Sequence, residues 1–301
     1  LSVGLQGLSL TDRSYQQARQ YAVDRKQGKA IGAELAAGES SPIADHADVR
    51  RMLMTMRANA EAMRCVMYAN AASIDFANSS EDDAERNAWD AVTALLTPIS
   101  KGWGTDLGVE MTSLGVQTHG GMGYVEETGA AQHWRDVRIA PIYEGTNGVQ
   151  AMDLLGRKVV RNGGETVHTF IKKVQETIDQ LDTNDPSQLS ISIHLKNSLD
   201  ALHSAVAWMI KTFPKQPGQA AAGATSFLEM MGLISGGWML ARGVIEADMQ
   251  LKNKQGDKNF LNSKITTAQY FSQAFLSRAP SLLYPITDCG DCVMEFEASN
   301  F

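Results

Sequence analysis

Residues 48–74, DVRRMLMTMRANAEAMRCVMYANAASI, decide the fold class of this chain. A stripe of mainly apolar residues runs through them in alternating steps of four and three, the spacing of one helix face. Asp48 stands just before the stripe and is a candidate N-cap. The stretch therefore predicts a long helix with one buried face. Its members are Val49, Leu53, Met56, Ala60, Met63, Met67, Asn70 and Ile74.

Helical patterns cover most of the remaining chain. We expect an earlier helix over about 5–27, a second helix over 82–97 that stops at Pro98, and a third from Ile99 to Leu114. Four more stripes follow, over 167–181, 195–213, 231–245 and 261–275. Convincing strand patterns and repeats are absent. The sequence predicts an all-α protein, an antiparallel helical bundle followed by a second helical bundle.

The composition changes at residues 161–164, Arg-Asn-Gly-Gly, which read as a flexible polar joint. We therefore expect a first domain over 1–160, an additional helical bundle over 161–285 and an acidic tail over 286–301. The chain begins at Leu1 in the middle of a pattern, as though it had been cut from something longer.

Charge and cysteine content restrict the partners. A net charge of −7 disfavours nucleic acid and anionic membranes. No apolar run approaches the ~20 residues that span a bilayer. The three cysteines fit a reducing compartment, and we expect a cytoplasmic protein. Cys289 and Cys292 are spaced like half of a metal site, but the other half is missing, so no metal is expected.

The residues that could do chemistry are concentrated at 115–148. Gly120, Gly121 and Gly123 would let the backbone approach a phosphate closely, although their spacing alone favours a glycine-rich helix break. Glu144 is either a general base for proton abstraction or an ordinary acid at a helix start. A basic cluster at residues 25–29 is either an anion site or a solvated helix end. These alternatives stay open on spacing alone.

Four segments in order resemble the C-terminal helical domain of the acyl-CoA dehydrogenase family. They are YAVDRKQGK at 21–29, GVQTHGGMG at 115–123, RDVR at 135–138 and IYEGTN at 142–147. The resemblance covers about residues 1–160. Residues 161–285 are similar to the additional C-terminal region of a bacterial subgroup that includes 3-methylmercaptopropionyl-CoA dehydrogenases.

The resemblance implies an FAD-dependent enzyme that oxidises an acyl-CoA thioester to the trans-2-enoyl product. Glu144 matches the catalytic base, and Tyr143 and Gly145 match residues that flank the thioester. Gly28 stands where the family usually has an aromatic residue, and Gly148 where it often has glutamine. The positions that match FAD-binding residues are Arg25, Gln27, Gln117, Thr118, His119, Gly120, Gly121, Thr146 and Gly148.

The same resemblance implies protein partners and further domains that catalysis would require. An electron-transfer flavoprotein is the expected electron acceptor, and a homodimer or homotetramer is expected because flavin sites in the family are shared between subunits. An N-terminal helical domain and a central β-domain, which enclose flavin and substrate in the family, are not in this chain, so the isolated chain should be a poor or inactive catalyst. Glu144 should face a cleft. The alternatives are an acyl-CoA oxidase and a non-catalytic helical interaction module.

Overall fold

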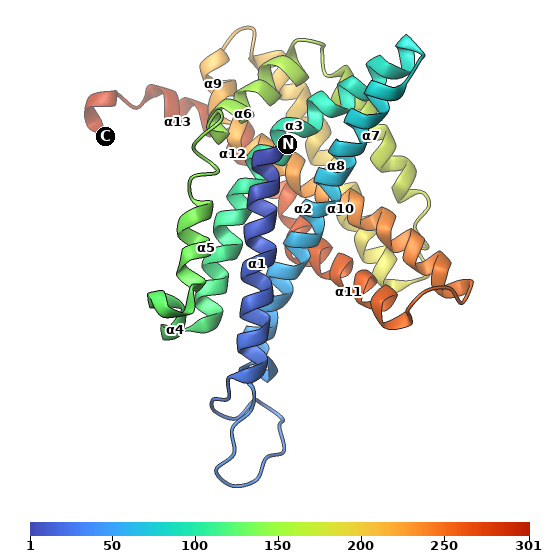
Figure 1. Ribbon diagram of the computed structural model, residues 1–301. Helices are drawn as coiled ribbons and strands as arrows, with labels where there is room; N and C mark the ends of the chain where they lie inside the picture. Colours follow the sequence, from blue (N-terminus) through green and yellow to red (C-terminus); the bar gives the residue numbers. More distant parts are fainter.

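The computed structural model describes all 301 residues, and the all-α prediction is confirmed (Figure 1). There is no β-sheet, only an isolated bridge between Lys26 and Pro42. The first half contains α1 (Ser2–Asp24), α2 (Ala47–Ser79), α3 (Asp83–His119), α4 (Gly121–Tyr124), α5 (Ala130–Val137) and α6 (Asn147–Asp153). The second half contains α7 (Glu165–Ile178), α8 (Pro186–Thr212), α9 (Pro217–Ala222), α10 (Ala224–Lys252), α11 (Lys258–Ala274), α12 (Leu283–Thr287) and α13 (Gly290–Glu295).

Short turns of other helix types join these elements. They are the 3₁₀ segments η1 (Ile43–Asp45), η2 (Glu126–Thr128), η4 (Leu276–Leu282) and η5 (Ala298–Asn300), and the π-helical segment η3 (Leu154–Val160) that continues α6. The polar joint expected at 161–164 forms a turn, in which Gly163 and Gly164 have φ values of 63° and 84°. None of the helices has both the length and the apolar character that crossing a bilayer requires.

The first bundle is built around α3. Helices α1, α2 and α5 pack along it, and α1 approaches it most closely through glycine. A Cβ atom on Gly7 would lie 2.6 Å from the carbonyl oxygen of Gly104. The absence of side chains at this crossing lets the two backbones touch, which fixes how the N-terminal half of α1 lies on α3.

Two predicted helix boundaries are wrong. Pro98 does not end a helix, because α3 runs through it from Asp83 to His119. The neighbouring side chains Leu96 and Ile99 are buried, and this packing outweighs the hydrogen bond that proline cannot donate. Asp48 is not the N-cap of α2, since that helix begins at Ala47; Asp48 lies in its first turn and pairs with Arg51 at 2.8 Å.

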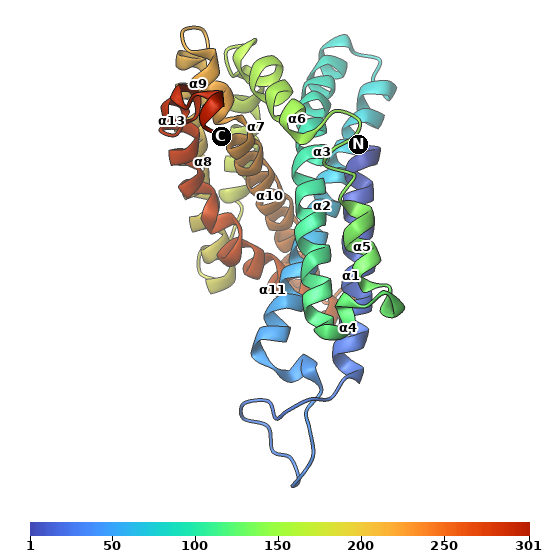
Figure 2. The same ribbon diagram turned by 90° about the vertical axis from the view of Figure 1, so that its left-hand side faces the viewer.

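The second half of the chain packs on the first through α10. In Figure 2 the helices that follow α6 lie on one side, and α1, α3 and α5 on the other. Helix α10 contacts α2 and α3 as well as α8 and α11. Trp103 of α3, which is 3% exposed, belongs to the same apolar cluster as Phe227 and Phe271 of the second half. Both halves therefore share one hydrophobic core.

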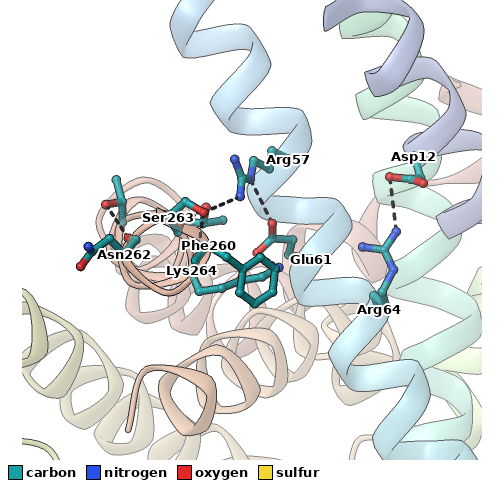
Figure 3. Close-up of polar contacts among 10 residues, drawn as sticks. Asp12, Arg57, Glu61, Arg64, Phe260, Asn262, Ser263 and Lys264 are labelled. Carbon is teal, nitrogen blue, oxygen red and sulfur yellow. Dashed lines mark hydrogen bonds and ion pairs between the residues drawn. The ribbon is translucent and has the colours of Figure 1, made fainter. Parts of the chain in front are cut away.

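A carboxylate on α2 ties α11 to the first bundle (Figure 3). Glu61 accepts a hydrogen bond from Nε of Arg57 at 3.0 Å and lies 3.0 Å from Nζ of Lys264. Arg57 also donates to Oγ of Ser263 at 3.2 Å. Because the Glu61 side chain is only 10% exposed, water screens these contacts less than those of a surface pair.

We expect Glu61→Gln to lower the free energy of unfolding by about 1–3 kcal/mol, because Arg57 and Lys264 would be left without their shared anion. Urea unfolding at low ionic strength measures the change. Asp48→Asn is the matched control, since its pair with Arg51 is exposed and should contribute less than about 0.5 kcal/mol. Equal effects of the two substitutions would contradict the prediction.

Candidate active site

The segment that carries Glu144 is a surface turn between α5 and α6. It is closed where the backbone N–H of Asn147 donates to the carbonyl of Pro141 at 3.0 Å. At its apex Glu144 has φ 54° and Gly145 has φ 79°, both in the left-handed region. The backbone N–H groups of Glu144 and Gly145 have no hydrogen-bond partner in the chain. The apex therefore presents one carboxylate and adjacent free amide donors.

Polar side chains of α3, of which Lys101 and Thr105 are buried, hold the base of this turn. Lys101 is 4% exposed, and its Nζ donates to the Pro141 carbonyl at 3.2 Å and to Oδ1 of Asn147 at 2.8 Å. Nδ2 of Asn147 donates to Oδ1 of Asp106 at 2.7 Å and to Oγ1 of Thr105 at 2.9 Å. Burial lowers the pKa of the Lys101 ammonium, and the nearby Asp106 carboxylate opposes that shift.

The expectation that Glu144 faces a cleft is wrong for this chain, because the residue is exposed. The turn lies on the outside of the bundle, where none of the thirteen helices covers it. Its surroundings are nevertheless apolar: Ile139, Ile142 and Val149 are 49%, 51% and 56% exposed. Large exposed apolar side chains close to a single carboxylate are typical of a surface that a protein partner or a ligand covers.

The two residues expected to flank a thioester are placed differently. The Tyr143 side chain turns towards α1, where its hydroxyl donates to Oε1 of Gln6. Gly145 is exposed, and its carbonyl accepts a bond from Nε2 of Gln150 at 3.4 Å. Thr146 donates its hydroxyl to the Pro141 carbonyl at 3.2 Å, and Gly148 has open space where a Cβ would stand.

The basic cluster at residues 25–29 follows the end of α1, at the end of the bundle from which a loop extends downward in Figures 1 and 2. Arg25 and Gln27 are exposed. Residues 41–43, at the end of the loop, hold their backbone in place. The Arg25 carbonyl accepts a hydrogen bond from the Ile43 N–H at 2.7 Å, and the Gln27 N–H donates to the Ser41 carbonyl at 3.0 Å. The side chains are thus free on a fixed backbone.

The glycine cluster, Gly120, Gly121 and Gly123, lies at the same end of the bundle as this basic cluster. The rings of Tyr21 and His119 stack with 4.6 Å between centroids, which joins the ends of α1 and α3. Gly120 has φ 59°, and a Cβ on either Gly120 or Gly121 would meet nothing within 4 Å. The backbone here is open to a ligand.

Two expected cofactor residues turn inward instead. The hydroxyl of Thr118 donates to the Leu114 carbonyl at 2.9 Å, and Nδ1 of His119 donates to the Gly115 carbonyl at 2.7 Å. Both side chains are buried, whereas Gln117 is exposed. Neither Thr118 nor His119 is therefore free to contact a ligand in this chain.

These two groups of candidate residues do not converge. Thr105, beside the Glu144 turn, and Gln117, beside the glycine cluster, are twelve residues apart on α3. That separation corresponds to about 18 Å along a helix axis. A single compact ligand cannot touch both groups, so they belong either to the two ends of a long ligand or to two binding sites.

Comparison with known proteins identifies the family of this chain. Residues 1–159 match the family described as acyl-CoA dehydrogenase, C-terminal domain, and residues 170–297 match acetyl-CoA dehydrogenase C-terminal like. The 3-methylmercaptopropionyl-CoA dehydrogenase of Ruegeria pomeroyi is 39% identical over 97% of this chain and 49% of its own length. This chain belongs to the acyl-CoA dehydrogenase family.

Solved structures share the fold of this chain. The acyl-CoA dehydrogenase of Bacillus anthracis complexed with FAD aligns with a TM-score of 0.72 and 18% identity, over 97% of this chain and 49% of that one. Caenorhabditis elegans ACDH-11 in complex with C11-CoA aligns with a TM-score of 0.68 and 20% identity, over 90% and 41%. The chain thus spans about half the length of the relatives it matches.

Sequence reasoning missed Lys101 and Asn147, which anchor the Glu144 turn to α3. No helical pattern pointed to Lys101, because the predicted stripe steps from Ile99 to Trp103 and leaves position 101 on the opposite face of the helix. Its burial follows from packing on both faces of α3 in this region. A charged residue at a buried position needs a partner. The partner could not be named from the sequence, since Asn147 lies 46 residues away.

A cavity of about 420 Å³ opens beside Pro141, between α3 and α10. Asp106, Glu110 and Glu229 line it, and desolvation raises the pKa of all three carboxyl groups. The chain has no cluster of three His, Cys, Asp or Glu side chains arranged to hold a metal ion. Cys289 and Cys292 are both exposed free thiols.

Proposed function

We propose that this chain supplies the proton-abstracting part of an FAD-dependent acyl-CoA dehydrogenase, with Glu144 as the base. The observation that carries the proposal is the turn between Pro141 and Asn147, which presents a carboxylate beside free amide donors on a buried anchor. Membership of the family supplies the substrate class, an acyl-CoA thioester. The protein of which these residues form part would convert it to the trans-2-enoyl-CoA.

The chemistry explains why such a turn would be useful. A proton next to a thioester carbonyl is a very weak acid, so the base must be held in place and the carbonyl must be polarised. The Glu144 carboxylate would take the α-proton, and the free N–H groups at the apex would donate to the thioester oxygen. FAD, when bound, would accept the β-hydrogen as a hydride with its two electrons.

The exposure of Glu144 makes a second component necessary. A carboxylate in water keeps its hydration shell, which weakens it as a base towards carbon. The exposed apolar residues Ile139, Ile142 and Val149 provide a surface on which further protein, flavin and acyl chain could exclude that water. We propose that parts of the protein outside these 301 residues complete the site.

The opposite end of the bundle fits the nucleotide part of FAD. Arg25, Gln27 and Gln117 are exposed there, and Gly120 and Gly121 leave room for a pyrophosphate to approach the backbone. Thr146 and Gly148 would contribute at the Glu144 end. Because the two ends are about 18 Å apart along α3, the proposal includes a homodimer or homotetramer in which one end serves a neighbouring subunit's flavin.

The decisive experiment is an anaerobic titration of the whole protein. It should carry a flavin absorbance that bleaches when a panel of acyl-CoA thioesters, including 3-methylmercaptopropionyl-CoA, is added. Electron-transfer flavoprotein should restore the colour. Release of hydrogen peroxide in air at the turnover rate would favour an acyl-CoA oxidase, and a colourless protein that does not bind flavin would favour the non-catalytic interaction module.

A further inference from the structure

The Glu144 turn has a weakness that its surroundings must offset. Glu144 is one of two non-glycine residues with a positive φ, a conformation that costs about 1 kcal/mol relative to ordinary backbone. Neither its side chain nor its backbone N–H makes a hydrogen bond within the chain. The position of the carboxylate is therefore set at the two ends of the turn.

Both ends converge on one buried point. The carbonyl oxygen of Pro141 accepts from Nζ of Lys101 at 3.2 Å, from the N–H of Asn147 at 3.0 Å and from the hydroxyl of Thr146 at 3.2 Å. Two of these donors belong to the far end of the turn, and the third belongs to α3. The Lys101 ammonium thus links both ends of the turn to the central helix.

The Asn147 side chain completes the connection. Its Oδ1 accepts from Lys101 at 2.8 Å, and its Nδ2 donates to the Gly102 carbonyl at 3.0 Å and to Asp106 at 2.7 Å. The donors and acceptors of this amide are all directed at α3. Burial of a lysine in a helical core is costly, and a methionine would fill the same space without that cost. Core stability alone does not explain the choice of lysine.

We propose that Lys101 and Asn147 are positioning residues that hold the Glu144 carboxylate in register for proton abstraction. The inference rests on the proposed function of Glu144. A misplacement of about 1 Å at a reacting centre can cost about 100-fold in rate, so a clamp at the base of a turn with no other anchor matters for catalysis. The network acts through Glu144 and touches neither substrate nor flavin.

The test uses the whole protein with bound flavin and compares Lys101→Met with the wild type. We expect the single-turnover rate of flavin bleaching to fall by about 10- to 100-fold, with KM and flavin content unchanged. Hydrogen exchange of the peptide that covers residues 141–149 should become faster, while peptides from α2 and α10 keep their protection. Lys158→Met is the matched control, because Lys158 is a half-buried lysine that pairs with Asp153 outside the network.

A double-variant cycle separates positioning from a general structural effect. If Lys101 acts through Glu144, then Lys101→Met slows the wild type but causes no further loss of the residual rate in a Glu144→Gln background. Equal slowing in both backgrounds, or an unchanged rate in the single variant, overturns the inference while leaving Glu144 as the base. Bleaching at the wild-type rate in Glu144→Gln alone overturns the proposed function instead.

Asn147→Ser provides the same test if Lys101→Met does not fold, because it removes the amide without leaving an apolar side chain against Asp106. The expected result is again a slower single turnover with unchanged KM. If both variants lose the folded state by circular dichroism, the network serves only stability and the inference is overturned.

Discussion

Glu144→Gln in the whole protein is expected to slow flavin bleaching by acyl-CoA by about 100- to 10,000-fold, the usual contribution of a positioned general base. Glutamine has nearly the same shape as glutamate but no basic oxygen, so the turn and its amide donors should persist. The yellow colour of bound flavin should also persist, because the Glu144 turn is anchored at Thr105 of α3, twelve residues from Gln117 and the glycine cluster. Stopped-flow absorbance under anaerobic conditions measures the rate.

A surface acid of the same half of the chain serves as control. Glu127→Gln removes an exposed carboxylate from η2 and should leave the bleaching rate unchanged. If Glu144→Gln bleaches at the wild-type rate, the base is another residue. If that variant loses its flavin, the effect cannot be attributed to proton abstraction, and Glu144 would have to be reassigned to cofactor binding.

Gly232→Ala is expected to lower the free energy of unfolding by about 1–3 kcal/mol, the cost of overpacking a core. A Cβ on Gly232 of α10 would overlap the indole of Trp103, with Cδ1 only 2.5 Å away. The ring cannot move aside easily, since Trp103 is 3% exposed. The substitution thus forces α10 away from α3, where the two halves of the chain share their core.

The matched control is Gly243→Ala in the same helix. Gly243 is exposed, and a Cβ there would meet nothing within 4 Å. Alanine should stabilise this position by about 0.5–1 kcal/mol, because it is the better helix former. Thermal and urea unfolding of the two variants should therefore move in opposite directions. A Gly232→Ala variant as stable as the wild type would mean that the two halves are not packed as described.

The sequence was sufficient for the helices and their buried faces. The stripe at 49–74 appears as α2, and the four later stripes appear as α7, α8, α10 and α11, because a spacing of three and four has only one regular interpretation. The prediction from sequence failed at Pro98. Local propensity predicts that a helix ends there, but tertiary packing lets α3 continue through the proline.

The site was predictable only in part. Motif order pointed to Glu144, Arg25 and the glycine cluster, and the stacking of Tyr21 on His119 brings the helix ends that precede Arg25 and Gly120 side by side. It did not predict that Thr118 and His119 turn inward, because residue spacing fixes a helix face only to within a few tens of degrees. Nor did it predict the exposed position of Glu144 or its anchor, since the contacts of Lys101 with residues 141 and 147 join segments about 40 residues apart.

The contact between Trp103 of α3 and Gly232 of α10 restricts how the sequences of such chains can diverge. An indole on one helix lies where the other carries hydrogen in place of a side chain, so neither partner can change size alone. A bulkier residue at 232 would require a smaller one at 103 in the same lineage. We therefore expect the distal helices to change together with the Glu144-bearing half, and recombination between distant relatives at the joint to bring mismatched surfaces together.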